Sequence, residues 1–414
     1  MFSRRSKITY FVLEGLNSFA LVYFFSFFYF FMKKNYGFGD AENLALAALN
    51  GGVYAIVSFW AGKFGSRFGY FAALRVAFVV MLGALTAGLL VHSEVGYILV
   101  MVVTVIGMCF TWPTLEALVS ERETRRGLQD MVGSYNVVWA GTSALAYFGG
   151  GAMLEKLGSK SLFYVPMAMQ LCQLGLTVWL ECLIRRSDTA HSAETPALRS
   201  ESCSEKGLAH RDAHVAASSM PEAHPCSPAT TRTFKRMAWL ANPFAYIAIN
   251  TLIAVMPGVS GRLGLTTTLA GFCGSIWYFV RLGAFAGLWY WDGWHYRFRW
   301  LLSAYLALVG SFALILLVPN LMVLVLAQFL FGGATGLIYY SSLFYSMDLS
   351  ETKSEHGGIH EAVIGLGNFA GPAVGSASLY LLPQYASSGA VAVSGLLLLG
   401  LGGLTVIWKS RSRH

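Results

Sequence analysis

Long apolar stretches recur along this chain, and they restrict its fold more than any other feature of the sequence. An apolar helix of about 20 residues is long enough to cross the hydrocarbon core of a bilayer. Hydrophobic residues make up 56% of the 414 residues and charged residues only 12%, a composition that is not typical of soluble domains. Twelve such stretches occupy residues 8–32, 42–61, 71–91, 95–117, 131–151, 161–184, 237–257, 266–290, 299–318, 320–346, 358–382 and 388–408. The sequence therefore predicts an all-α integral membrane protein with twelve transmembrane helices.

A polar segment divides these stretches into two groups of six. Residues 185–236 are rich in Ser, Thr, Ala, His and Pro and contain few large apolar residues, so this segment cannot bury enough surface to fold. We expect an N-terminal six-helix bundle over residues 1–184, a flexible cytoplasmic linker over residues 185–236 and a C-terminal six-helix bundle over residues 237–414. The histidines are irregularly spaced and no cysteine pair has metal-ligand spacing, so we predict no metal site, no cofactor and no disulfide.

The two groups of stretches resemble each other when the second is shifted back by 225 residues. The coinciding positions are Asn17 with Asn242, Gly62 with Gly287, 133–136 with 358–361, and Gly150 with Gly375. Each match is weak by itself because glycine is common in this chain. One shift that serves several positions without gaps nevertheless indicates an internal repeat of six spans.

The short turn between the second and third stretches carries the most informative local motif. Residues 62–70 read Gly-Lys-Phe-Gly-Ser-Arg-Phe-Gly-Tyr, and we expect the three glycines to end both flanking helices. The turn is similar to the loop between the second and third helices of major facilitator superfamily transporters, which has the pattern Gly-x-Leu-x-Asp-Arg-x-Gly-Arg/Lys. The matching residues are Gly62, Phe64, Arg67 and Gly69. With twelve spans, a repeat and a central linker, the chain resembles this superfamily over nearly its whole length.

The resemblance implies two pseudo-symmetric bundles that rock around a central cavity, and a charge cluster at the turn that closes the cytoplasmic side. The residues expected in this cytoplasmic gate are Gly62, Lys63, Arg67, Gly69 and Asp292, with acidic partners near Glu121, Glu123 and Asp130. Ser66 stands where the superfamily has Asp, and Tyr70 where it has a last basic residue. The missing Asp predicts a less favoured outward-facing state, and it leaves open a receptor or scaffold that has kept the fold without transport.

The distribution of Lys and Arg predicts the orientation. With both termini cytoplasmic, and with the long linker left aside, 15 basic residues lie in cytoplasmic segments and five lie in outer loops. This asymmetry follows the positive-inside rule. The net charge of +8 is therefore explained by membrane topology, and we predict no nucleic-acid partner. We expect a multi-pass protein of the cell membrane, in contact with lipid and monomeric.

Arg281 is the one basic residue well inside a predicted span. Trp277 and Tyr278 precede it by four and three positions, on the same helix face. One interpretation is a substrate site in which the guanidinium holds an anionic or polar group and the rings supply apolar and cation–π contact. The other is structural, with Arg281 neutralised by Glu14, Glu116 or Glu361 and tying helices together.

Four residues could carry protons across the membrane, because ionisable groups inside spans are costly unless they are paired or functional. They are Glu14, Glu116, His360 and Glu361. Glu14 could line the central cavity, pair with an Arg or reach the cytoplasmic surface. His360 and Glu361 open the eleventh helix, where the helix dipole alone would also favour the carboxylate.

Other polar and aromatic residues inside the spans are candidates for substrate contacts. The predicted substrate-binding set is Asn17, Trp112, Asn136, Trp139, Trp277, Tyr278, Arg281, Gln328 and Asn368, and Tyr339 and Tyr340 are further candidates for the cavity wall. Most of the 29 Phe residues are better explained by packing or by contact with lipid.

These features favour a secondary transporter over an enzyme. No phosphate-binding loop, Cys-x-x-Cys, Gly-x-Ser-x-Gly or His-Glu-x-x-His motif occurs in the sequence. We predict alternating-access transport of a small polar or anionic organic solute, such as a sugar or an organic acid, with proton coupling favoured and uniport left open. The alternatives are proton-driven efflux of amphipathic drug-like compounds, or a membrane receptor or scaffold that does not transport.

Overall fold

The chain is built from α-helices, and the number of spans agrees with the prediction. The computed structural model describes residues 4–120, 125–198, 228–348 and 353–410. Within these residues, twelve helical segments are long and apolar enough to cross a membrane. Because this number is even, both termini lie on the same side of the membrane. We call this the termini side and the opposite one the far side.

The first six spans run from α1 to α7, with the fourth span divided in two. Their bounds are α1 Arg4–Tyr36, α2 Asp40–Phe68, α3 Tyr70–Leu90, α4 Glu94–Met108, α5 Trp112–Ser120, α6 Arg125–Lys156 and α7 Ser161–Leu198. The last six run from α8 to α14, with the eighth span divided. Their bounds are α8 Pro228–Arg262, α9 Thr267–Gly274, α10 Ile276–Tyr290, the 3-10 turn η1 Asp292–Trp294, α11 Phe298–Leu317, α12 Leu321–Asp348, α13 Lys353–Leu381 and α14 Ser388–Ser410.

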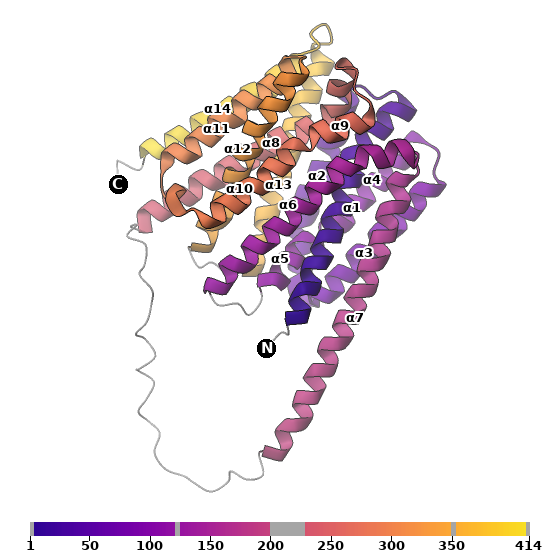
Figure 1. Cartoon of the computed structure of the whole chain (residues 1–414), viewed down its shortest axis with the longest axis vertical. Helices are drawn as coiled ribbons and strands as arrows, with labels where there is room; N and C mark the ends of the chain where they lie inside the picture. Colours follow the sequence, from indigo (N-terminus) through magenta and orange to yellow (C-terminus); the bar gives the residue numbers. More distant parts are fainter. Residues whose placement is uncertain (1–3, 121–124, 199–227, 349–352, 411–414) are drawn as a thin grey trace.

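The helices form two bundles that meet along a central interface (Figure 1). In the first bundle α1 packs against α6 and α7, and α3 packs against α4 and α7. In the second, α12 packs against α8, α10 and α11, and α13 against α8 and α14. Between the bundles, α2 packs along α13, and α6 packs against both α9 and α10. Helices α1 and α8 face the space between the two bundles.

The turn at residues 62–70 is shorter than predicted. Helix α2 continues through Gly62 and Gly65 to Phe68, and only Gly69, with a φ of +89°, leaves the helix before α3 begins. A glycine inside a helix costs only about 1 kcal/mol relative to alanine. The packing of α2 compensates this cost at Gly62 and Gly65. A positive φ, by contrast, is a conformation that glycine adopts readily and other residues rarely do.

Two spans predicted as continuous are broken near the middle. The fourth span is interrupted between α4 and α5, where Thr111 Oγ1 donates a hydrogen bond to the Met108 carbonyl at 2.8 Å and Pro113 lacks the amide that a continuous helix would use. The eighth span is interrupted at Ser275, between α9 and α10. The break separates Trp112 and Glu116, which lie on α5, from α4.

The predicted linker is partly helical. Helix α7 continues past residue 184 to Leu198, beyond the ends of the neighbouring helices (Figure 1), and α8 already begins at Pro228. Ala, Glu, Arg and Leu in the first part of this segment are strong helix formers, so a helix extends into sequence that cannot form a core. Residues 199–227 lie outside the described part of the chain.

Four polar contacts join the two bundles on the far side. Lys33 Nζ donates to the Pro257 carbonyl at 2.8 Å, Arg262 pairs with Asp40 at 2.9 Å, and Ser376 Oγ donates to the Ala41 carbonyl at 2.9 Å. In the fourth contact, the backbone amide and the hydroxyl of Thr268 donate to the Glu155 carboxylate at 2.9 and 2.7 Å. We call this set the far-side ties. They connect α1, α2 and α6 to α8, α9 and α13.

Candidate functional site

A cavity of about 150 Å³ lies between the two bundles. Its wall comes from both of them: α1, α2, α4, α5 and α6 on one side, and α8, α10, α12 and α13 on the other. The polar and aromatic lining residues are Phe25, Ser26, Tyr29, Asn50, Tyr54, Trp112, Glu116, Tyr135, Trp139, Ser143, Tyr246, Asn250, Trp277, Tyr278, Arg281, Tyr339, Glu361 and Asn368. The apolar remainder of the wall is supplied mainly by α1 and α8.

Arg281 lies in this wall with only 3% of its surface exposed, and aromatic rings surround its guanidinium. The guanidinium carbon is 4.6 Å from the ring centroid of Trp139, 5.0 Å from that of Tyr339, 5.4 Å from that of Phe285 and 5.9 Å from that of Tyr246. Trp139 belongs to the first bundle, so the group that surrounds Arg281 includes both halves. Such faces attract the cation but accept no conventional hydrogen bond.

The hydrogen-bonding capacity of Arg281 is incompletely used. Its Nε and Nη2 atoms are buried and have no hydrogen-bond partner in the described part of the chain. No ion pair within 4.0 Å joins Arg281 to a described carboxylate. The structural interpretation, in which Glu14, Glu116 or Glu361 neutralises Arg281, therefore has no direct contact to support it.

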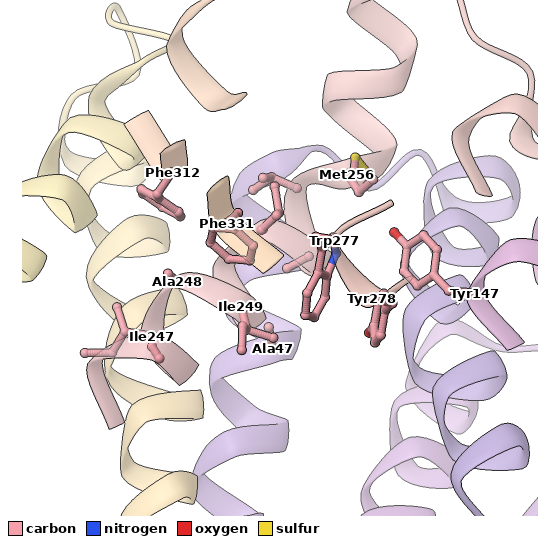
Figure 2. Packing of buried hydrophobic residues seen from close by; sticks show 14 of the residues in the cluster. Ala47, Tyr147, Ile247, Ala248, Ile249, Met256, Trp277, Tyr278, Phe312 and Phe331 are labelled. Atoms are coloured by element: carbon pink, nitrogen blue, oxygen red, sulfur yellow. The ribbon is translucent and has the colours of Figure 1, made fainter. Parts of the chain in front are cut away.

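The two rings predicted to flank Arg281 have other neighbours. Trp277 and Tyr278 line the same cavity, but the Tyr278 ring packs against Tyr147 of α6 at 5.1 Å and the Trp277 ring against Phe331 of α12 at 5.5 Å. Figure 2 shows Tyr147 facing Tyr278, with Phe331 near Trp277. These two rings pack against other helices, and the guanidinium is instead surrounded by Phe285 of the same helix and by three rings from other helices.

The carboxylates that reach the cavity come from opposite bundles. Glu116 on α5 is half-buried, and among the described residues it accepts no hydrogen bond and forms no ion pair. Glu361 on α13 accepts a hydrogen bond from Tyr54 of α2, across the interface, and its Oε1 lies 3.8 Å from His360 Nδ1. His360 also contacts Asn242 and Ser342 through Nε2, each at 3.3 Å, and lies behind the cavity wall.

Glu14 is fully buried behind the wall, not exposed in the cavity. Its carboxylate accepts hydrogen bonds from Ser18 at 2.6 Å and from the Tyr135 hydroxyl at 2.9 Å. Tyr135 lines the cavity, so one phenol separates the buried carboxylate from the solute space.

The polar layers of the two bundles correspond through the predicted shift of 225 residues. Glu14 contacts Tyr135 in the first bundle, and Trp239 contacts His360 in the second, with ring centroids 6.0 Å apart. Each residue of the second pair is the repeat partner of one in the first. The predicted repeat thus places two pairs of corresponding residues next to each other, one pair in each bundle.

Three other predicted substrate residues lie outside the cavity wall. Asn17 donates a hydrogen bond to Thr111 at 3.2 Å, next to the break in the fourth span. Asn136 and Gln328 are buried, and their side-chain amides have no hydrogen-bond partner among the described residues. Asn368 does line the cavity and is hydrogen-bonded to Asn250. Tyr340 packs beside Trp294, with ring centroids 5.9 Å apart, and does not line the cavity.

The predicted gate residues are on the termini side, with aromatic neighbours in place of the expected acidic ones. Lys63 Nζ lies 4.2 Å from the Phe59 ring centroid, and the Arg67 guanidinium carbon lies 5.3 Å from that of Phe68. Asp292 lies 3.9 Å from His295. Asp130 is exposed, and Glu121 and Glu123 fall outside the described residues. Gly62 lies within α2 and Gly69 forms the turn.

Sequence reasoning missed several cavity residues, most of them tyrosines and asparagines. They are Tyr29, Asn50, Tyr54, Tyr135, Tyr246 and Asn250. A tyrosine in an apolar span is indistinguishable from a packing residue in a single sequence. Asn50 and Asn250 carried a usable signal, because an amide inside a span is nearly as informative as a charge.

Twelve spans in two bundles, with a cavity between them that polar and aromatic side chains line, are the architecture of secondary membrane transporters. A family model of the major facilitator superfamily matches residues 10–376, and the chain belongs to this superfamily. It is a transporter and not an enzyme. No curated protein sequence matches the chain.

Solved structures of similar fold cover nearly the whole chain. A mutant form of the nucleoside transporter NupG has a TM-score of 0.66 at 12% identity, with 99% of each chain covered. A D-xylose-proton symporter has a TM-score of 0.66 at 13% identity, with 98% of each chain covered. A bacterial homologue of the human lysosomal transporter Spinster, in an inward-facing and unoccupied conformation, has a TM-score of 0.59 at 12% identity, with 98% of this chain and 95% of that chain covered. At these identities the likeness concerns the fold alone.

Proposed function

We propose that this protein moves a small polar or anionic organic solute through the central cavity by alternating access, coupled to protons. The observation that carries the proposal is Arg281, a buried guanidinium with two unpaired nitrogens in the cavity wall. A buried cation without a partner costs several kcal/mol. An anionic group on the solute would supply the missing hydrogen bonds.

The arrangement of Arg281 supports transport as well as binding. Its guanidinium contacts Trp139 of the first bundle and Tyr339 of the second, so a solute held there would sense the relative position of the bundles. Rocking of the bundles would change the surroundings of the bound group. Alternating access requires this dependence of the site on conformation.

Proton coupling is supported by carboxylates at and behind the cavity. Glu116 faces the cavity without a partner among the described residues, Glu361 joins the bundles through Tyr54, and Glu14 lies one phenol away from the solute space. These groups can take up and release protons during the cycle. The same proposal places both termini and the linker in the cytoplasm of the cell, as the charge asymmetry predicts.

Uptake into proteoliposomes tests this function. We expect a panel of polar and anionic metabolites to include a solute that accumulates under an imposed pH gradient. Arg281→Lys keeps the charge but loses the planar two-pronged geometry, and should lower the affinity for that solute by about tenfold or more at normal protein abundance. Arg75→Lys is the matched control, because Arg75 pairs with Glu181 between α3 and α7, away from the cavity.

The alternatives give different results in the same vesicles. Expulsion of amphipathic dyes without uptake of any metabolite would support drug efflux. A lack of movement of every compound would favour a receptor or scaffold. If Arg281→Lys transports the metabolite with unchanged affinity, Arg281 does not bind it.

A further inference from the structure

Three ionisable side chains of opposite signs line the cavity in the described part of the chain. Arg281 contributes a positive charge, while Glu116 and Glu361 are carboxyl groups. Arg281 and Glu116 each lack an ionic partner among the described residues, although both face the same small space. Two unpaired groups of opposite sign in one cavity are a feature that a purely anionic solute would not explain.

The Tyr339 ring lies near both the positive group and the histidine that neighbours Glu361. The Tyr339 ring centroid is 5.0 Å from the Arg281 guanidinium carbon and 6.3 Å from the His360 ring centroid. His360 Nδ1 is in turn 3.8 Å from Glu361. Because Arg281, Glu116 and Glu361 line one small cavity, a solute with two charged groups could reach both poles through charge-assisted hydrogen bonds of about 2.8 Å each.

The acidic pole holds two carboxyl groups, and His360 lies beside only one of them, Glu361. Glu116 comes from α5 of the first bundle and Glu361 from α13 of the second, and both face one cavity. Two carboxylates that share a site repel each other unless a proton or a cation lies between them. A solute that brings only an anionic group would satisfy Arg281 and add to this repulsion.

We infer that the solute is a zwitterion, an α-amino acid with an apolar side chain, whose carboxylate binds Arg281 and whose ammonium group binds Glu116. The inference rests on the proposed transport function and names its substrate class. The rest of the cavity wall suits an apolar side chain, because Leu21, Val22 and Phe25 of α1 face Ile249 and Ile253 of α8. The ammonium group compensates one carboxylate, and the other remains available for the coupled proton.

Matched sets of ligands test the inference on the unmodified full chain. Leucine, isocaproate and isoamylamine share one side chain but carry both charges, the carboxylate only and the ammonium only. Alanine and phenylalanine form the same sets with propionate and ethylamine, and with hydrocinnamate and phenethylamine. Binding is measured by ligand-induced thermal stabilisation, and transport by uptake into proteoliposomes. We expect at least one amino acid to bind about tenfold or more tightly than both of its analogues.

A pair of variants assigns the ammonium group to its partner. Glu116→Gln should weaken binding of the preferred amino acid by about tenfold and leave binding of its desamino analogue unchanged. Glu94→Gln, at an exposed position at the start of α4, should alter neither.

The outcomes separate this inference from the proposed function. Equal binding of an amino acid and its desamino acid, or the absence of binding by any of the amino acids, overturns the inference. If a sugar or a simple organic acid accumulates instead, the transport proposal stands without it. If no metabolite in the wider panel moves, both fail.

Discussion

Glu14 is a residue whose proposed role in proton coupling would not require contact with the solute. Its carboxylate is fully buried, and in the described part of the chain its two partners are hydroxyl groups, those of Ser18 and Tyr135. Burying a carboxylate without a cation is costly, so these two donors stabilise the charge whenever the proton leaves. Tyr135 also lines the cavity, so its phenol connects Glu14 to the solute space.

Removal of the Tyr135 hydroxyl should separate proton movement from solute movement. In Tyr135→Phe we expect proton-driven accumulation to fall by about tenfold, because one charge-assisted hydrogen bond to Glu14 is lost. Solute exchange without a pH gradient should be retained. Uptake under a pH gradient and counterflow at uniform pH measure the two processes. Tyr164→Phe, at an exposed tyrosine of α7, is the control. Equal loss of both processes would mean that Tyr135 has a structural or binding role.

At the residue scale, the sequence predicted the charges of the site better than their partners. Arg281, Glu116 and Glu361 stood out because ionisable groups inside spans are rare, and all three line the cavity. Of the rings around Arg281, helical spacing could have indicated only Phe285, four residues later on α10, because Trp139, Tyr246 and Tyr339 come from other helices. Such contacts depend on the packing of the bundles, which a single sequence does not specify.

At the scale of elements, the contact between α2 and α13 depends on glycines. A side chain at Gly51 would collide with the backbone of Asn368, and one at Gly365 with the backbone and side chain of Ala55. These positions let helices from opposite bundles approach closely beside the cavity, as small residues do between membrane helices. The same closeness places Tyr54 of α2 within hydrogen-bond reach of Glu361 of α13.

A methyl group at this contact should therefore be harmful. We expect Gly365→Ala to destabilise the protein by about 1–3 kcal/mol through overpacking and to lower its melting temperature in detergent. Gly83→Ala on α3 is the control, because a side chain there would meet no neighbour within 4 Å. Thermal unfolding of purified protein measures both variants. If Gly365→Ala and Gly83→Ala melt at the same temperature, the close contact between α2 and α13 does not contribute to stability.

The sequence predicted the number of spans from length and apolarity, which are local properties. It did not predict the breaks at Thr111 and Ser275, because these depend on capping and on neighbouring helices. It also ended α2 too early at Gly62, since packing against α13 outweighs the modest cost of glycine in a helix.

At the scale of the whole molecule, the far-side ties and the sidedness of the membrane belong together. Lys33, Arg262 and Glu155 all lie on the far side, where they join the two bundles. If the termini are cytoplasmic, these ties join the bundles on the exterior side of the membrane. The repeat, the even number of spans and the charge asymmetry were all readable from the sequence, whereas the ties were not, because they pair residues of different bundles.

Site-directed labelling can establish the sidedness. In a background without the six natural cysteines, a cysteine at position 210 in the linker should react with a membrane-impermeant maleimide only after cells are permeabilised. A cysteine at position 160, in the loop before α7, should react in intact cells. Labelling of the linker from outside intact cells would reverse the orientation.

The matching contacts Glu14–Tyr135 and Trp239–His360 have a historical consequence. Two equivalent contacts at one constant offset are what the duplication and fusion of a six-span ancestor leaves behind. Since then the copies have specialised: one has a carboxyl group at this layer and the other an imidazole. The two copies therefore no longer carry the same ionisable group at this layer, and under the proposed function the proton-carrying groups are divided between them.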